Sequence, residues 1–221
     1  MTLSVVIPAL NAAHTLPATL SAVVAADEII VVDGGSTDAT ANVARMMGAT
    51  VMASPRGRGR QLAAGAGQAR SDWLLFLHAD TVPGPGWLDE MCAFCRDPAN
   101  LRRAGVFRFA LDDESGAAQW LEAAVNMRTR VLGLPYGDQG LLLSRIFYDD
   151  LGGFRPVPLM EDVDIVRRIG RGAIVPLTTV AVTSAERWRR DGWIRRSLRN
   201  LACLGLYFAG VPAHHLKRIY G

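Results

Sequence analysis

The sequence predicts an α/β domain with a mostly parallel central sheet flanked by helices, then a half of mixed α+β structure, then a basic amphipathic helix at the C-terminal end. Three observations support this prediction. Short apolar runs alternate with segments of helical spacing over about the first 85 residues, which is typical of βαβ units. Beyond residue 98 the regular alternation ends. From Arg187 onward, arginine and apolar side chains recur at helical intervals.

The first half contains the elements of a parallel sheet. Apolar runs bounded by turn residues predict strands that are buried on both faces. Asp38 is expected to cap the second helix and Gly48 to end it. We expect strands at residues 3–8, 28–32, 49–53 and 73–80, and helices at 15–24, 38–48 and 61–69.

In the second half, the sequence predicts helices and strands that do not alternate regularly. A helix is expected after Trp87, and residues 104–111 have the alternating character of a strand. Helical patterns cover residues 116–132 and 161–169, with a short strand at 141–143 between them. These elements are expected to extend the same sheet.

The composition is that of a globular protein with a sizeable core. Of the 221 residues, 50% are hydrophobic and 20% are charged, which argues against disorder. The first residues are too short an apolar stretch for a signal peptide, and no segment approaches the ~18–20 apolar residues of a membrane span. Three cysteines, an odd number, fit a reducing compartment. We therefore expect a cytoplasmic protein.

Acidic residues end two of the predicted strands. Asp33 follows one apolar run and precedes a Gly-Gly-Ser-Thr turn, and Asp80 ends another. Open α/β sheets bind ligands at the carboxyl ends of their strands. Asp33 could therefore accept hydrogen bonds from a base or ribose, and Asp80 could bind a divalent cation with phosphate oxygens. A capped turn without a ligand explains the Asp33 segment equally well. The Asp80 segment is the stronger signal, because a carboxylate at the end of a buried strand is costly unless it binds something; a capping histidine at position 78 without a ligand is its alternative.

Two further segments carry charges suited to catalysis. Residues 56–61 form a glycine-containing loop with three arginines, which suits a diphosphate or a solvated surface. Glu161, Asp162 and Asp164 cluster at the start of a predicted helix. Capping explains one of these acids but not three, and a carboxylate at a helix start is well placed to act as a general base.

In series, these motifs resemble the family 2 inverting glycosyltransferases with a GT-A fold, of the short, non-processive type. The resemblance covers roughly residues 1 to 190. The segments that carry it are 8–11 (Pro-Ala-Leu-Asn), 32–38 (Val-Asp-Gly-Gly-Ser-Thr-Asp), 78–80 (His-Ala-Asp), 152–154 (Gly-Gly-Phe) and 161–162 (Glu-Asp).

The resemblance implies a role for particular residues. Asp162 would be the catalytic base with Glu161 beside it, and Asp80 with His78 would hold Mg²⁺ or Mn²⁺ on the donor's diphosphate. The other residues would bind the donor, a nucleoside-diphosphate sugar: Pro8, Ala9, Asn11, Asp33, Gly35, Ser36, Arg58, Arg60, Gln61, Arg187 and Trp188. The resemblance implies a domain over residues 1–186, with a nucleotide-binding half at 1–98 and an acceptor half at 99–186, and a separate basic amphipathic helical segment at 187–221.

Two departures from the family pattern leave alternatives open. His78 stands where the family usually has the first Asp of its D-x-D motif, and Ser184 replaces the Gln of a Q-x-x-R-W element. These departures favour one alternative, a sugar-nucleotide-binding protein without transferase activity. A second alternative is a nucleotidyltransferase, which also has a nucleotide-binding α/β sheet with paired acids around magnesium. The apolar stripe of the last segment fits a membrane surface or a packed helix better than nucleic acid. Attachment to the inner face of the membrane would favour a lipid-linked acceptor.

Overall fold

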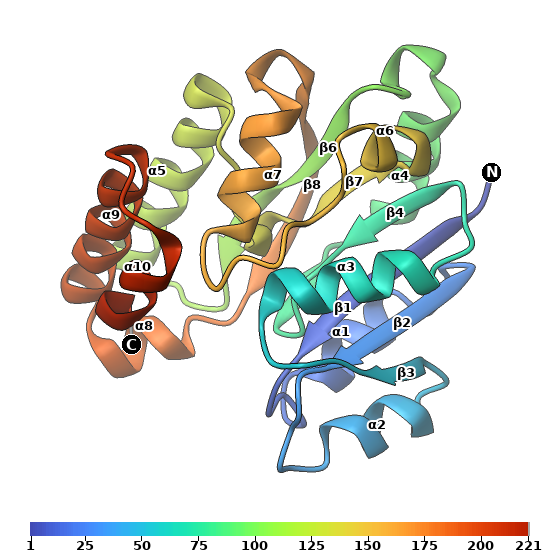
Figure 1. Cartoon of the computed structure of the whole chain (residues 1–221), viewed down its shortest axis with the longest axis horizontal. Coiled ribbons are helices and arrows are strands. Elements are labelled where there is room, and N and C mark those ends of the chain that lie inside the picture. The colour runs from blue at the N-terminus through green and yellow to red at the C-terminus, as the bar shows by residue number, and fades with distance from the viewer. Residues whose placement is uncertain (221) are drawn as a thin grey trace.

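One eight-stranded sheet runs through residues 1–220, which are the residues that this computed structural model describes (Figure 1). The strand order is β3-β2-β1-β4-β7-β6-β8-β5. The strands are β1 (Leu3–Ala9), β2 (Glu28–Asp33), β3 (Thr50–Ala53), β4 (Trp73–Phe76), β5 (Thr81–Pro83), β6 (Ala104–Leu111), β7 (Leu141–Ser144) and β8 (Ile174–Thr183).

The predicted α/β architecture is confirmed. Strands β1 to β4 are all parallel, as the alternation of apolar runs and helices requires. In the second half, β7 is antiparallel to both β4 and β6, β8 is parallel to β6, and β5 is antiparallel to β8. The sheet is therefore mixed where the sequence predicted mixed structure.

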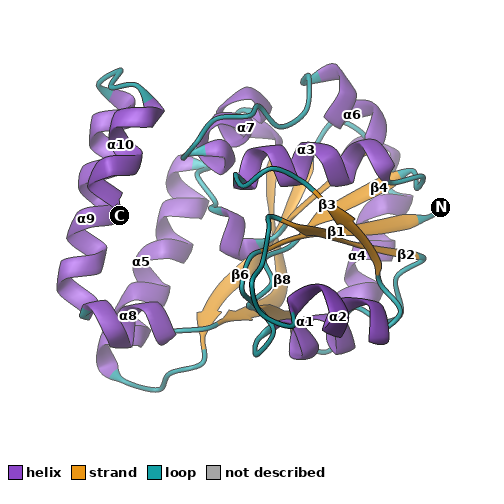
Figure 2. Ribbon diagram, turned by 60° about the horizontal axis from the view of Figure 1, so that its bottom comes forward, coloured by secondary structure: helices purple, strands orange, loops and turns teal. Residues whose placement is uncertain are grey.

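Helices cover both faces of the sheet (Figure 2). One face packs against α1, α2 and α4, and the other against α3, α6 and α7. The helices are α1 (Leu16–Ala22), α2 (Thr40–Met46), α3 (Arg58–Gln68), α4 (Trp87–Arg96), α5 (Gly116–Leu132), α6 (Arg145–Asp150), α7 (Glu161–Ile169), α8 (Glu186–Asp191), α9 (Trp193–Phe208) and α10 (Ala213–Tyr220), with single 3₁₀ turns η1 (Pro98–Asn100), η2 (Gly137–Gln139) and η3 (Arg171–Ala173).

The structure corrects three predictions. The apolar run from Trp73 is buried, but β4 ends at Phe76, so Asp80 lies in a turn and not at the strand's last residue. The ten-residue β8 was not predicted; Pro176 lies in it beside an irregularity in the β6 pairing, where a strand tolerates proline. The basic segment is not one helix but three, interrupted at Gly192 and again at residues 209–212.

Helix α3 can lie close to the sheet because of Gly65. A Cβ at this position would meet Val6 Cγ1 at 2.4 Å and Val32 Cγ2 at 2.9 Å, both in buried strands. We expect Gly65→Ala to destabilise the fold by about 1–3 kcal/mol through overpacking. Gly67→Ala on the same helix is the matched control, since its Cβ would meet nothing within 4 Å, and it should stabilise by up to about 1 kcal/mol. Urea unfolding measures both; equal effects would contradict this packing.

Candidate active site

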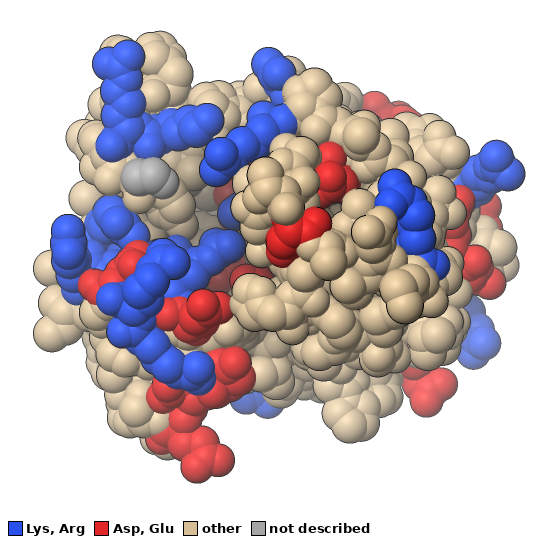
Figure 3. All heavy atoms as spheres, turned by 90° about the horizontal axis from the view of Figure 1, so that it is seen from below, with Lys and Arg blue, Asp and Glu red and all other residues tan. Residues whose placement is uncertain are grey.

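A cavity of about 370 Å³ lies between the start of α7, the η2 turn, helix α5 and the C-terminal helices. Figure 3 shows this face of the molecule hollowed beside the C-terminal helices, with basic and acidic side chains around the hollow. Several predicted site residues from distant parts of the sequence line this one cavity: Arg58, His78, Asp80, Glu161, Asp162, Arg187 and Trp188.

Asp80 is held in the turn between β4 and β5 by contacts with β8. Its backbone carbonyl accepts a hydrogen bond from Ser184 N at 3.1 Å. Next to it, the hydroxyls of Thr81 and Thr183 are 2.8 Å apart and buried. The pairing of β5 with the unpredicted strand β8 therefore fixes the turn that brings Asp80 to the cavity.

Asp162 is the second residue of helix α7, and two backbone amides orient its carboxylate. Val163 N donates to Oδ1 at 2.8 Å, and Gly137 N donates to Oδ2 at 3.1 Å. The helix is preceded by Met160 in a left-handed conformation, with φ of 65°. Such backbone strain in a non-glycine residue is concentrated at functional sites. The carboxylate is thus rigidly placed at the cavity wall.

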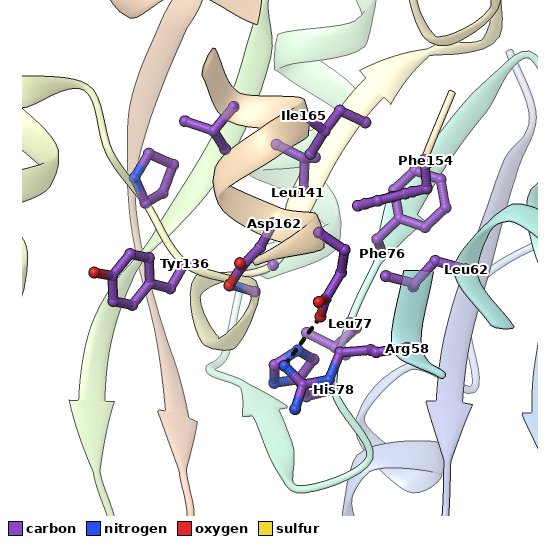
Figure 4. A pocket seen from close by; sticks show the side chains of 15 residues that line it. Arg58, Leu62, Phe76, Leu77, His78, Tyr136, Leu141, Phe154, Asp162 and Ile165 are labelled. Atoms are coloured by element: carbon purple, nitrogen blue, oxygen red, sulfur yellow. Dashed lines mark hydrogen bonds and ion pairs between the residues drawn. The ribbon is translucent and has the colours of Figure 1, made fainter. Parts of the chain in front are cut away.

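Glu161, the first residue of α7, forms an ion pair with Arg58 of α3. The distance from Arg58 Nη1 to Glu161 Oε1 is 3.2 Å, and the Glu161 side chain is only 3% exposed. The dashed line in Figure 4 marks this ion pair, with Arg58 drawn close to His78. Burial opposes the charge on Arg58, but Glu161 and then Asp162 outweigh it and raise the arginine's pKa above its ordinary value. The pair joins α3 to α7 at the cavity.

His78 is a neutral imidazole in this environment. Burial lowers its pKa well below the ordinary value of 6.5, and the charges of Arg58 and Arg187 lower it further. The ring lies against the η2 turn, where a Cβ on Gly137 would be 2.5 Å from His78 Nε2. Glycine at this position therefore permits the ring and the Asp162 carboxylate to approach the same turn.

The predicted nucleoside-binding residues lie together at the ends of β1 and β2, outside the lining of this cavity. Asn11 N donates to Ser36 Oγ at 2.9 Å, and Ser36 N donates to Asp33 at 3.2 Å. Gly35 has φ of 90° with open space beside it, and Pro8 and Ala9 belong to the adjoining β1. These residues form a connected, hydrogen-bonded turn.

The remaining predicted residues divide into structural and exposed positions. Gln61 is buried, and its Nε2 donates to the carbonyls of Ala9 and Val32 at 2.9 and 2.8 Å, which joins α3 to both strand ends. Arg60 is exposed on α3. On α8, Trp188 is buried beneath the cavity and Arg187 is exposed at its edge.

Sequence reasoning missed several residues of the cavity. Within residues 1–220, seven buried side-chain polar atoms have no hydrogen-bond partner, and six of them belong to residues lining this cavity. Since an unpaired buried polar group costs about 1–3 kcal/mol, their concentration here indicates a site for a polar ligand. Four of the six residues were not among the predicted site residues: Arg128, Asp138, Arg196 and Asn200. The other two are Trp188 and Glu161, and Glu161 Oε1 forms the ion pair with Arg58 described above.

The side chains of this cavity suit a divalent cation that takes most of its ligands from a phosphate group. No group of three or more His, Cys, Asp or Glu residues in the described chain is arranged to hold a metal by itself. Mg²⁺ usually needs only one or two carboxylates when substrate phosphates supply the rest. The Asp80 carboxylate and the neutral ring of His78 line the same cavity and meet that requirement.

The family model of glycosyl transferase family 2 matches residues 4–130, which is more than half of the chain. The protein therefore belongs to that family, as the sequence motifs indicated. An uncharacterized glycosyltransferase of Mycobacterium tuberculosis is 39% identical over 99 residues, and one of Mycobacterium bovis is equally similar. These matches cover 44% of this chain and 45% of each relative, so less than half of either protein is compared.

Solved structures extend the similarity to most of the chain. Glucosyl-3-phosphoglycerate synthase from Mycobacterium tuberculosis with Mn²⁺, uridine diphosphate and glucosyl-3-phosphoglycerate has a TM-score of 0.60 and 25% identity, covering 83% of this chain and 70% of the synthase. The same synthase with Mg²⁺ and uridine diphosphate has a TM-score of 0.58 and 25% identity, with coverage of 83% and 69%. The GT-A-like fold is thereby confirmed.

Among the helices of residues 1–220, none combines the length and the apolar character that crossing a bilayer requires.

Proposed function

We propose that the protein transfers one sugar from a nucleoside-diphosphate sugar to an acceptor hydroxyl, with inversion at the anomeric carbon. The observation that carries this proposal is that Asp80 and Asp162, 82 positions apart in sequence, line the same cavity. One carboxylate suits a diphosphate-bound cation, and the other suits proton removal. Membership of glycosyl transferase family 2 supports the reaction class.

The donor would extend from the strand ends to the cavity. Asp33, Asn11 and Ser36 would receive the nucleoside, and Asp80 with His78 would hold Mg²⁺ or Mn²⁺ on the diphosphate. The cation would supply positive charge that neutralises the diphosphate. Complexes of the similar synthase with Mn²⁺ or Mg²⁺ and uridine diphosphate support this arrangement.

The transfer would be a single displacement. Asp162 would take the proton of the acceptor hydroxyl while the hydroxyl oxygen forms its bond to the anomeric carbon. The bond from that carbon to the diphosphate oxygen breaks at the same time, and the diphosphate leaves with the electron pair. Arg187, at the cavity edge, would stabilise this departing charge. Glu161, paired with Arg58, would fix the helix start that carries the base.

A donor screen tests the proposal. Purified protein with Mn²⁺ should bind at least one of UDP-glucose, UDP-galactose, UDP-N-acetylglucosamine and GDP-mannose by calorimetry, and should release nucleoside diphosphate on incubation. Binding without any hydrolysis or transfer would indicate a catalytically silent binder. Pyrophosphate release from a sugar phosphate and a nucleoside triphosphate would indicate a nucleotidyltransferase.

The C-terminal segment bears on the acceptor. Exposed apolar side chains lie along α9, among them Ile194, Leu198 and Leu201, next to several arginines. This combination supports contact with an anionic membrane surface and hence a lipid-linked acceptor. Flotation with anionic liposomes should recover the wild type but not Ile194→Ser/Leu198→Ser. Equal recovery of the two proteins would reject membrane contact.

A further inference from the structure

The η2 turn adds a further carboxylate, that of Asp138, to the cavity that Asp80 and Asp162 line. On one side, the preceding residue Gly137 donates its N–H to Asp162 Oδ2. On the other side, the Asp138 carbonyl accepts a hydrogen bond from Thr183 Oγ1 at 3.2 Å. Thr183 in turn contacts the hydroxyl of Thr81, the neighbour of Asp80. Asp138 is therefore connected to both acids through short chains of contacts.

The turn that carries Asp138 is firmly anchored in the core. Gln139 is fully buried, and its Oε1 accepts a hydrogen bond from Thr129 Oγ1 at 2.9 Å. Its Nε2 donates to the carbonyl of Phe107 at 3.1 Å. A side chain on so rigid a turn is held in place before any ligand arrives, which is what a specific binding group requires.

The Asp138 side chain is unpartnered. Its Oδ1 is buried without a hydrogen bond from any residue of the described chain. Burial, reinforced by the nearby charges of Asp162 and Asp80 and opposed by Arg128, raises the pKa of this carboxyl to about 6. A ligand that donates a hydrogen bond to this buried, unpaired carboxylate would therefore bind with favourable free energy.

Arg128 of α5 lines the same cavity with a free donor. Its guanidinium lies 3.5 Å from the centre of the Tyr136 ring, and its Nε donates to the Leu134 carbonyl at 2.8 Å. Its second terminal nitrogen, Nη2, is buried and bonds to nothing, Asp138 included. The cavity therefore presents an unused acceptor and an unused donor, which is the complement of a hydroxyl group.

We propose that Asp138 and Arg128 bind hydroxyl groups of the sugar that is transferred and so select the donor. This inference rests on the proposed function, because the sugar must lie between the diphosphate at Asp80 and the acceptor oxygen at Asp162. Asp138 is connected to both of these residues. A sugar hydroxyl donates to the carboxylate and accepts from the guanidinium at the same time.

The test compares nucleotide and nucleotide-sugar binding in Asp138→Asn. Calorimetry with Mn²⁺ gives the Kd of UDP and of UDP-glucose, or of the nucleotide and sugar nucleotide that bind best in the donor screen. We expect the Kd ratio of sugar nucleotide to nucleotide to rise about tenfold or more in the variant, with the Kd of the nucleotide unchanged within twofold. Asp89→Asn, an exposed carboxylate on α4, removes the same charge outside the cavity and should leave both Kd values unchanged.

A second arm identifies the hydroxyl. Deoxy analogues of the bound sugar, lacking one hydroxyl each, should bind the wild type more weakly for at least one position. That loss should vanish in Asp138→Asn and shrink in Arg128→Lys, which keeps the charge but not the fork of donors.

Thermal unfolding shows that the variant is folded. At pH 7.5 the Tm of Asp138→Asn should equal or exceed that of the wild type, since a buried charge is removed. The difference should shrink as the pH falls below about 6, where the wild-type carboxyl becomes protonated in the folded protein.

Three results would overturn the inference. An unchanged ratio in Asp138→Asn, with sugar nucleotide still bound, would reject it and leave the proposed function intact. Weaker binding of UDP with Mn²⁺ would make Asp138 a metal ligand and not a sugar-binding residue. Absence of binding by every sugar nucleotide in the wild type would reject the proposed function and this inference with it.

Discussion

Asp162→Asn is expected to lower the rate of sugar transfer by about 10²–10⁴-fold, the usual contribution of a positioned general base. The amide is close in shape to the carboxylate but does not accept a proton at neutral pH. Because the Asp162 carboxylate faces the cavity and not the strand ends proposed for the nucleoside, the Kd of the donor should stay within about twofold. Steady-state rates and calorimetry on the same preparation separate the two effects.

Asp164→Asn provides the control for this experiment. Asp164 lies in the same first turn of α7 but forms ion pairs with Arg155 and Arg168 and does not line the cavity. Its removal should reduce stability and leave the transfer rate within about threefold. Full turnover by Asp162→Asn, or an equal loss of rate in both variants, would remove Asp162 from the role of base.

Asp80→Ala is expected to abolish the part of donor binding that depends on the divalent cation. With Mn²⁺ present, the Kd of the sugar nucleotide should rise about tenfold or more. With EDTA in place of Mn²⁺, the variant and the wild type should bind equally weakly. Calorimetric titration under both conditions measures the difference.

The turn around Asp80 should survive the substitution, since it is held by the backbone bond to Ser184 and by the contact of Thr81 with Thr183. Asp89→Ala, on the exposed side of α4, is the matched control and should retain the full effect of Mn²⁺. If Asp80→Ala also retained that effect, the cation would have to be held elsewhere.

The sequence predicted the elements whose signal is local. Apolar runs such as that from Trp73 mark buried strands, and the helices α5 and α7 begin and end where their periodicity does. Strand β8 was missed because Pro176 interrupts it and its burial does not alternate regularly. The sequence predicts one helix where the structure has α8, α9 and α10, because the repeating apolar pattern is stronger than the signal for breaks at Gly192 and near Pro212.

The sequence predicts only those site residues that stand in recognisable motifs. Asp80 and Asp162 stand in acid-bearing segments that are recognisable in sequence, whereas Arg128 and Asp138 do not. What distinguishes them is the lack of a hydrogen-bond partner in the folded protein. That property depends on contacts between segments far apart in the chain, such as the bond from Gly137 to Asp162.

The position of the cation and the sugar in the cavity tests the account most directly. Crystals grown with Mn²⁺ and an unreactive analogue of the sugar nucleotide should show an anomalous manganese peak within coordination distance of the Asp80 carboxylate. The anomeric carbon should face Asp162, with a sugar hydroxyl bonded to Asp138. A manganese peak remote from Asp80, or a sugar bound outside the cavity that these three acids line, would contradict the account.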